Sequence, residues 1–344
     1  MSLESFIQAM PKVELHVHLA GSIRPKTLVA LSNRHGRPLP ESELERTGAW
    51  PPFRDFLHFM SDITQASGMV RSPHDIELIA CEFMEDQAVQ NILYTEVTFT
   101  AYGNDFIRGI PIGEQLAALG RARAWAEANL GVTFRIILDS FRGMSVEETL
   151  VVADWAIDGM DQGVVALGLG GDENRRPTGY FVGAFARAKA AGLARVPHAG
   201  EVAGPESVWG ALRDLDATRI AHGVRCLEDA SLVSELRDRG VALDVCPSSN
   251  VSLGVFPDLP SHALPRMMEA GLNVTVSTDD PPMFNTTLTK EYIAICDAYG
   301  FGADEVERLV LNGVRATLLP EAERVAMESQ FRARLAELRV IHGV

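Results

Sequence analysis

Eight short runs of apolar residues recur along the chain and predict β-strands. Their sequences are VELHVH (13–18), ILYTEVTF (92–99), VTFRIIL (132–138), VVALGLG (164–170), LARVPHA (193–199), TRIAHG (218–223), VALDVC (241–246) and LNVTVSTD (272–279). Longer segments with apolar positions at helical spacing lie between them, such as GEQLAALGRARAWAEANL, SVEETLVVADWAIDGM and DASLVSELRDRG. Alternating strands and helices are typical of a parallel sheet, and eight such units predict an α/β fold, the closed (β/α)8 TIM barrel.

The first crossover is longer than the others, since residues 19–91 separate the first two predicted strands. It contains helix candidates with a proline near each start, where proline is tolerated: Pro25, Pro52 and Pro73. We expect a helical lid insertion at about residues 25–90, within one hydrolase domain that spans residues 1–344. One helical stripe in this insertion fits either ordinary core packing or a lid that places Phe56 against the substrate; its residues are Phe53, Phe56, Leu57 and Met60.

Composition and charge narrow the possible partners and location. The 344 residues are 47% hydrophobic and 22% charged, which is a globular composition. The net charge of -15 would repel nucleic acid and anionic membranes, so we expect neither as a partner. The sequence contains no apolar stretch of about 18 residues and no signal peptide pattern, so we expect a cytoplasmic protein.

The cysteines exclude two kinds of site. Cys81, Cys226, Cys246 and Cys296 are far apart and form no C-x-x-C pair, which argues against a disulfide framework and a cysteine zinc cage. A metal ion in this protein must therefore be held by nitrogen and oxygen ligands.

Polar side chains suited to metal or proton chemistry stand at the ends of four predicted strands. They are His16, His18, His198, Glu201, His222, Asp279 and Asp280. The other histidines fall in helical or terminal segments: His35, His58, His74, His262 and His342. Taken singly, each group has a plain structural role, as a buried histidine bonded to a carbonyl or an aspartate in a turn or helix cap. Together they favour an active site, because catalytic groups of a (β/α)8 barrel lie at the carboxyl ends of its strands.

A zinc site is the simplest arrangement of these groups. Three histidines and one carboxylate suit zinc with an open position for water, and the set is His16, His18, His198 and Asp279. Glu201, three residues beyond a ligand, is placed to protonate the substrate, and His222 is free to hold the water. We therefore predict hydrolytic chemistry.

The sequence resembles the adenosine deaminase family of the amidohydrolase superfamily through motifs in the family's order along almost the whole chain. The motifs are PKVELHVHLAGS, LGLGGDE, PHAGE with GPESVW, RIAHG, CPSSN and STDDPPMF. The resemblance implies that a zinc-bound hydroxide attacks C6 of an adenine ring and that ammonia leaves. It implies one Zn2+ per chain and a small-molecule purine nucleoside as substrate, and it leaves the oligomeric state open.

The resemblance also implies a role for each residue. It assigns His16, His18, His198 and Asp279 to zinc, with Asp279 also catalytic and His18 also bordering the substrate. Glu201 would protonate ring N1 and His222 would orient the water. Asp280 would contact N7, and the backbone of Gly171 would contact N3.

Three alternatives compete with this interpretation. A binuclear amidohydrolase needs a lysine or glutamate at the end of strand four, where no lysine stands and Glu173 lies in the GDE turn. A cytidine-type deaminase needs H-x-E with P-C-x-x-C, which CPSSN does not supply. A non-enzymatic barrel protein would have a damaged ligand set, and this one is intact.

Two departures from the family pattern concern the substrate. Ala20 stands where members acting on adenosine carry aspartate and relatives acting on adenine carry glutamate, and Gly168 stands where aspartate is common. A site with Ala20 lacks an acceptor for the ribose 5′-hydroxyl. The resemblance therefore leaves adenosine as the first substrate, 6-aminodeoxyfutalosine or another 5′-modified adenosine as the alternative, and adenine as the third.

Overall fold

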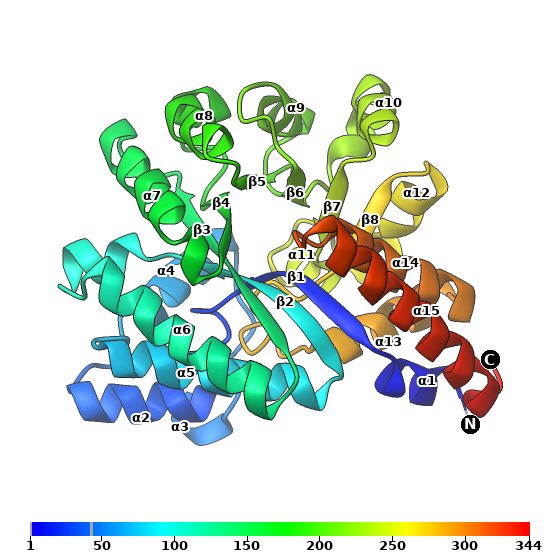
Figure 1. Cartoon of the computed structure of the whole chain (residues 1–344), viewed down its shortest axis with the longest axis horizontal. Helices are drawn as coiled ribbons and strands as arrows, with labels where there is room; N and C mark the ends of the chain where they lie inside the picture. Colours follow the sequence, from blue (N-terminus) through cyan, green and yellow to red (C-terminus); the bar gives the residue numbers. More distant parts are fainter. Residues whose placement is uncertain (1, 42–43) are drawn as a thin grey trace.

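Eight parallel strands form the predicted α/β barrel in the computed structural model, which describes residues 2–41 and 44–344 (Figure 1). The strands are β1 (Lys12–His18), β2 (Ile92–Phe99), β3 (Thr133–Phe141), β4 (Val164–Gly170), β5 (Ala194–Ala199), β6 (Arg219–His222), β7 (Ala242–Val245) and β8 (Asn273–Val276). Each strand pairs with the next in sequence order. The last strand ends three residues before the predicted end at Asp279, whose φ of 67° is incompatible with a strand.

Helices surround the strands, and the two chain ends lie close together (Figure 1). Among the described residues the α-helices are α1 (Leu3–Ala9), α2 (Pro25–His35), α3 (Leu44–Thr47), α4 (Phe56–Ser67), α5 (Pro73–Val89), α6 (Ile112–Asn129), α7 (Val146–Asp158), α8 (Val182–Ala190), α9 (Pro205–Arg213), α10 (Ala230–Arg239), α11 (Pro247–Ser252), α12 (Leu264–Glu269), α13 (Leu288–Tyr299), α14 (Ala303–Ala316) and α15 (Glu321–His342). None of these helices combines the length and the apolar character needed to cross a membrane.

Local sequence signals explain where several helices begin. Pro25 and Pro73 occupy the first turns of α2 and α5, as predicted. At the start of α7, the Ser145 hydroxyl accepts a hydrogen bond from the Glu148 backbone N–H while the Glu148 carboxylate accepts one from the Ser145 N–H. These reciprocal bonds satisfy backbone donors that the first turn of a helix leaves without partners.

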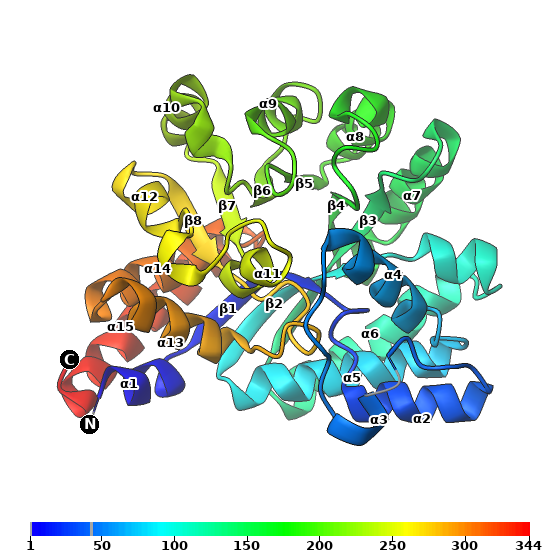
Figure 2. The ribbon, with the colours of Figure 1, turned by 180° about the vertical axis from the view of Figure 1, so that it is seen from behind.

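Helices α2, α3, α4 and α5 lie between β1 and β2, and Figure 2 shows α2, α3 and α4 on one side of the barrel. Helix α5 packs against α6 and β2, so it belongs to the outer ring of helices. The prediction of one apolar stripe in α4 was wrong for Phe53 and Leu57. Because α4 begins only at Phe56, after its cap Asp55, Phe53 lies outside the helix and Leu57 is 69% exposed. Phe59 is buried in their place.

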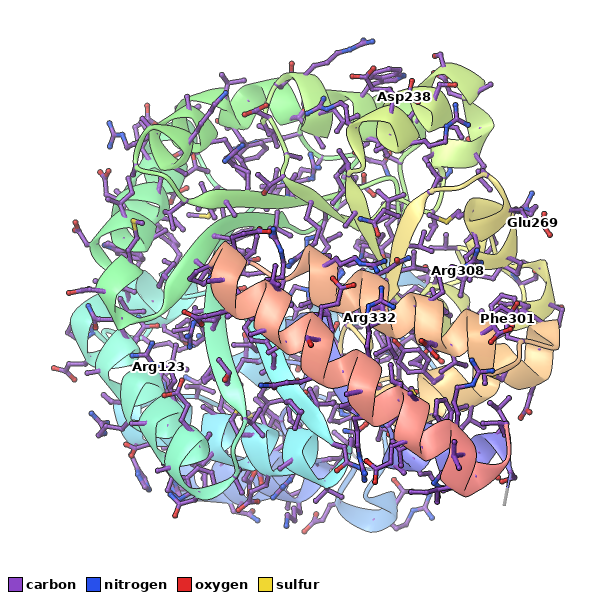
Figure 3. The ribbon with its side chains drawn as sticks, turned by 45° about the vertical axis from the view of Figure 1, so that its right-hand side comes forward. Arg123, Asp238, Glu269, Phe301, Arg308 and Arg332 are labelled. Carbon is purple, nitrogen blue, oxygen red and sulfur yellow. The ribbon has the colours of Figure 1, made fainter. Side chains whose placement is uncertain are left out.

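A buried ion cluster fills the amino-terminal end of the barrel. The Arg219 guanidinium lies 2.5 Å from the Glu96 carboxylate and 2.6 Å from the Asp244 carboxylate. It also donates to the backbone carbonyls of Leu15 and Ala316. The Ala316 carbonyl belongs to the end of α14, and the next helix, α15, crosses the strands in Figure 3, where Arg332 is labelled on it. The cluster therefore ties the end of α14 to the interior of the barrel.

We expect Arg219→Met to lower the free energy of unfolding by about 3 to 5 kcal/mol, because it leaves two buried carboxylates without compensation. Arg187→Met is the matched control, since the Arg187–Asp154 pair is half exposed and such pairs contribute less than about 1 kcal/mol. Urea denaturation at neutral pH measures both. Equal losses in the two variants would show that the buried cluster is not a special source of stability.

Candidate metal centre and active site

Four side chains converge at the carboxyl ends of β1, β5 and β8. His198 Nε2 lies 3.1 Å from His16 Nε2 and 3.2 Å from His18 Nε2. Asp279 Oδ1 lies 3.4 Å and 3.3 Å from the same two imidazole atoms of β1. Tetrahedral zinc ligands at their usual bond lengths are separated by about 3.3 to 3.6 Å. The measured distances are close to this range, and all four atoms lie within 4.8 Å of one another, so the group could hold a metal ion.

Hydrogen bonds on the far side of three of these side chains fix their orientation. His198 Nδ1 lies 2.9 Å from the Leu169 carbonyl oxygen, and His16 Nδ1 lies 3.4 Å from the Asp244 carbonyl oxygen. The Ser249 hydroxyl donates to Asp279 Oδ2 at 2.7 Å. These partners leave the two Nε2 atoms and one carboxylate oxygen facing the centre, as in known metal sites.

The charge states of the ligands suit metal binding. Burial lowers the pKa of His18 to about 4, and burial with the neighbouring histidines lowers the pKa of His198 well below its usual value, so both imidazoles favour the neutral form that binds metal. Burial alone would raise the pKa of Asp279, but the hydrogen bond and charge of His16 outweigh it and lower this pKa well below its usual value. Burial alone would lower the pKa of His16, but the hydrogen bond and charge of Asp279 outweigh it and raise this pKa, so a metal ion competes with a proton at this imidazole.

Two of the site residues adopt a backbone conformation that is unusual for residues other than glycine. The φ angles of His222 and Asp279 are 68° and 67°. The Asp279 N–H donates to the His16 carbonyl oxygen at 3.0 Å, and the His18 N–H donates to the Asp279 carbonyl oxygen at 2.8 Å. The surrounding backbone thus holds a strained residue in place, which is typical of functional sites.

Glu201 and His222 lie beside the ligand cluster. Glu201 Oε1 is 3.6 Å from His222 Nε2, and both side chains are buried. Burial, followed by the charges of Asp279 and Glu173, raises the pKa of Glu201 well above its usual value. A carboxyl group that stays protonated near neutral pH is a suitable proton donor.

Glu173 holds the loop that carries Glu201. Its carboxylate accepts hydrogen bonds from the backbone N–H groups of Gly200 and Glu201, each at 2.8 Å, and of Val202 at 2.9 Å. The Ser207 hydroxyl also donates to it. Sequence reasoning considered Glu173 only as a second metal ligand. Its place in the turn after β4, next to the turn after β5, was the available signal for this role.

The residues expected to contact the substrate occupy different positions around the mouth. Asp280 is buried, and its Oδ1 has no hydrogen-bond partner. Burial and the neighbouring Asp279 raise the pKa of Asp280 well above its usual value. Gly171 has a φ of 84° just after β4. Ala20 is half-buried after β1, and Phe56 is half-buried at the start of α4.

Gly21 makes room for Asp280. A Cβ atom at position 21 would overlap the Asp280 carboxyl group, so the absence of a side chain there is what lets this acid enter the site. The overlap with a residue distant in sequence was visible only in the folded chain.

Comparisons with known proteins identify the family to which the chain belongs. The family profile described as adenosine deaminase matches residues 11–333. The chain is 36% identical to the adenine deaminase of Rhodospirillum rubrum over 329 residues, covering 96% of this chain and 98% of that one. It is 37% identical to the aminodeoxyfutalosine deaminase of Streptomyces coelicolor over 330 residues, covering 95% and 85%.

Solved structures share the fold along its whole length. The adenine deaminase of Arthrobacter aurescens superposes with a TM-score of 0.88 at 29% identity, covering 96% of this chain and 99% of that one. An amidohydrolase from Burkholderia ambifaria with bound Zn superposes with a TM-score of 0.90 at 25% identity, covering 99% and 94%. The fold and the relatives define a deaminase, a hydrolase that acts on C–N bonds. The chain belongs to the adenosine deaminase family.

We expect Gly21→Ala to lower kcat/KM by about 10- to 100-fold, because the Asp280 carboxyl must move and misplacing a site group by about 1 Å has effects of this size. Gly120→Ala in α6 is the control, since a Cβ atom there meets nothing within 4 Å. Steady-state kinetics with thermal melting compares the two. Unchanged kinetics in Gly21→Ala would show that Asp280 does not need its present position.

Proposed function

We propose that this protein hydrolytically removes the 6-amino group of an adenine ring with the help of one zinc ion. The observation that carries the proposal is the buried cluster of three imidazoles and one ionised carboxylate beside a raised-pKa Glu201. The zinc-bound structure from Burkholderia ambifaria supports the choice of metal. A protein that only binds purines would have no need for a buried proton donor next to a metal site.

His16, His18, His198 and Asp279 would hold the zinc ion. When bound, zinc lowers the pKa of a water molecule toward about 7 and so supplies a nucleophile at neutral pH. Glu201 would donate its proton to ring N1, which prepares C6 for attack. A protonated Asp280 would donate to N7, and the Gly171 N–H would bind N3.

Helix α4 would act as a lid over the bound base. Phe53 and Phe59 pack at ring distances of 5.9 Å and 5.3 Å against Phe284, which follows β8 shortly after the ligand Asp279. Phe56 adds a half-buried ring at the first turn of α4. An apolar cover of this kind excludes water from the reacting atoms and strengthens polar contacts inside the site.

We place 5′-modified adenosines, such as 6-aminodeoxyfutalosine, ahead of adenosine as substrates. The reason is Ala20, which provides no carboxylate to accept a hydrogen bond from a 5′-hydroxyl. Two relatives of similar identity are named for compounds without a free 5′-hydroxyl, an aminodeoxyfutalosine deaminase and an adenine deaminase. The second candidate is therefore adenine, which lacks the whole ribose.

We expect Glu201→Gln to keep one zinc per chain and to lose about 10²- to 10⁴-fold in kcat, because this residue is assigned to proton transfer and not to coordination. Metal analysis and kinetics on the same preparation test both statements. In the parent enzyme, kcat/KM should fall as the pH rises through the raised pKa of Glu201, since the proton needed at N1 is then lost. Loss of zinc from the variant would contradict the assignment.

A substrate panel tests the assignment of Ala20. Adenosine, 5′-deoxyadenosine, 5′-methylthioadenosine, 6-aminodeoxyfutalosine and adenine are compared in the parent enzyme and in Ala20→Asp. The new carboxylate should raise the adenosine preference over 5′-deoxyadenosine by about 10- to 100-fold, the value of a hydrogen bond to a charged group. A parent enzyme that already prefers adenosine by about 100-fold would show that another residue binds the hydroxyl.

A further inference from the structure

A line of three buried side chains runs away from the active site behind His222. His222 Nδ1 lies 3.4 Å from Asn250 Nδ2, and Asn250 Oδ1 lies 3.1 Å from His262 Nε2. His262 Nδ1 accepts a hydrogen bond from the Leu264 backbone N–H at 3.0 Å. All three side chains are at most 2% exposed. His262 is one of the histidines that sequence reasoning left outside the site.

The Leu264 N–H sets the direction of every bond in this line. Because a backbone N–H can only donate, His262 Nδ1 must carry no proton. In a neutral imidazole the proton is then on Nε2, which donates to the Asn250 carbonyl oxygen. The Asn250 amide therefore directs its NH2 group at His222 Nδ1, which must accept. The remaining proton of His222 is on Nε2.

The reversed orientation of Asn250 is excluded by the same count of donors. Turning the amide over would point its NH2 group at His262 Nε2, while the Leu264 N–H still points at Nδ1. Both nitrogens of His262 would then have to accept, and a neutral imidazole has only one bare nitrogen. Burial favours the neutral form of His262, since it lowers the pKa of this residue to about 4.

We propose that Asn250 and His262 are positioning residues that hold His222 in the tautomer with its proton on Nε2. Nε2 is the atom that faces Glu201 at 3.6 Å, beside the metal ligands. His222 therefore presents a hydrogen-bond donor to the active site and has no lone pair there to remove a proton. Given the proposed function, His222 would donate to the attacking oxygen and stabilise its negative charge.

The tautomer can be measured without any assay of activity. Two-bond 15N–1H correlation spectra of the zinc-loaded enzyme, labelled with 15N-histidine, distinguish a bare Nδ1 from a bare Nε2. His222→Gln identifies the His222 signals by their loss. We expect a bare Nδ1 and a protonated Nε2 in His222, with the same tautomer in His262. A bare Nε2 in His222 would overturn the proposal even if the enzyme proves to be an adenine-ring deaminase.

A substitution that reverses the direction of these hydrogen bonds provides the second test. Asn250→Asp introduces a carboxylate that can only accept, which moves the His222 proton to Nδ1. By comparison with other enzymes in which a histidine is held in the wrong tautomer, kcat should fall by about 10²-fold or more, with zinc content and KM little changed. A normal kcat together with a reversed tautomer would show that the tautomer does not matter to catalysis.

Position 262 supplies a matched pair of variants. His262→Gln keeps a donor for Asn250 and an acceptor for the Leu264 N–H, so it should preserve the His222 tautomer and most of kcat. His262→Phe keeps a ring but neither nitrogen, so it should lower kcat and broaden or mix the His222 signals. His342→Phe is the control, because His342 is also hydrogen bonded at Nδ1 but lies beside Ser5 at the chain ends. Equal losses in His262→Gln and His262→Phe would reduce the role of His262 to packing.

Discussion

The barrel closes through the backbone of the residues that we propose as metal ligands. Among the described residues, β1 and β8 share no extended ladder, and an isolated parallel bridge joins Val17 of β1 to Asp279, three residues after the end of β8. The two hydrogen bonds of this closure connect Asp279 with His16 and His18. The Ser277 hydroxyl adds bonds from the backbone N–H groups of Leu15 and His16. The spacing of the ligands and the closure of the fold therefore depend on the same few bonds.

Asp244 connects the site at the mouth of the barrel to the buried ion cluster below it. The Asp244 carboxylate lies against Arg219 in the amino-terminal ion cluster, while its backbone carbonyl faces His16 Nδ1. One residue thus links the cluster that supports the barrel to a ligand of the metal site. Buried polar groups without partners are costly. A shift of Asp244 would therefore leave polar atoms without partners both in the ion cluster and beside His16. The interior behaves as one connected network from Arg219 to the mouth.

The sequence was sufficient for the barrel and for the residues that meet at its mouth, for a physical reason. Strand periodicity marked all eight strands, and the carboxyl ends of parallel strands necessarily meet at one edge, so the order of residues alone groups His16, His198 and Asp279. The predicted buried face of α4 was wrong because the face that a residue occupies depends on where the helix begins, and α4 begins only at Phe56. His262 was missed because it reaches His222 only through a contact with Asn250 in the folded chain.

The protonation pattern of the pocket fits the ring that the proposed reaction would consume. Asp279 is the carboxylate that imidazoles hold in the ionised form, whereas Glu201 and Asp280 keep raised pKa values because nothing comparable compensates their charge. In their protonated forms both acids would be hydrogen-bond donors, as is the Gly171 N–H, and N1, N7 and N3 of an adenine ring are all acceptors. In the proposed reaction Glu201 would give its proton to N1, and its carboxylate would then accept a hydrogen bond from the N–H that the product carries there. The same residue would thus be complementary to the substrate before the reaction and to the product after it.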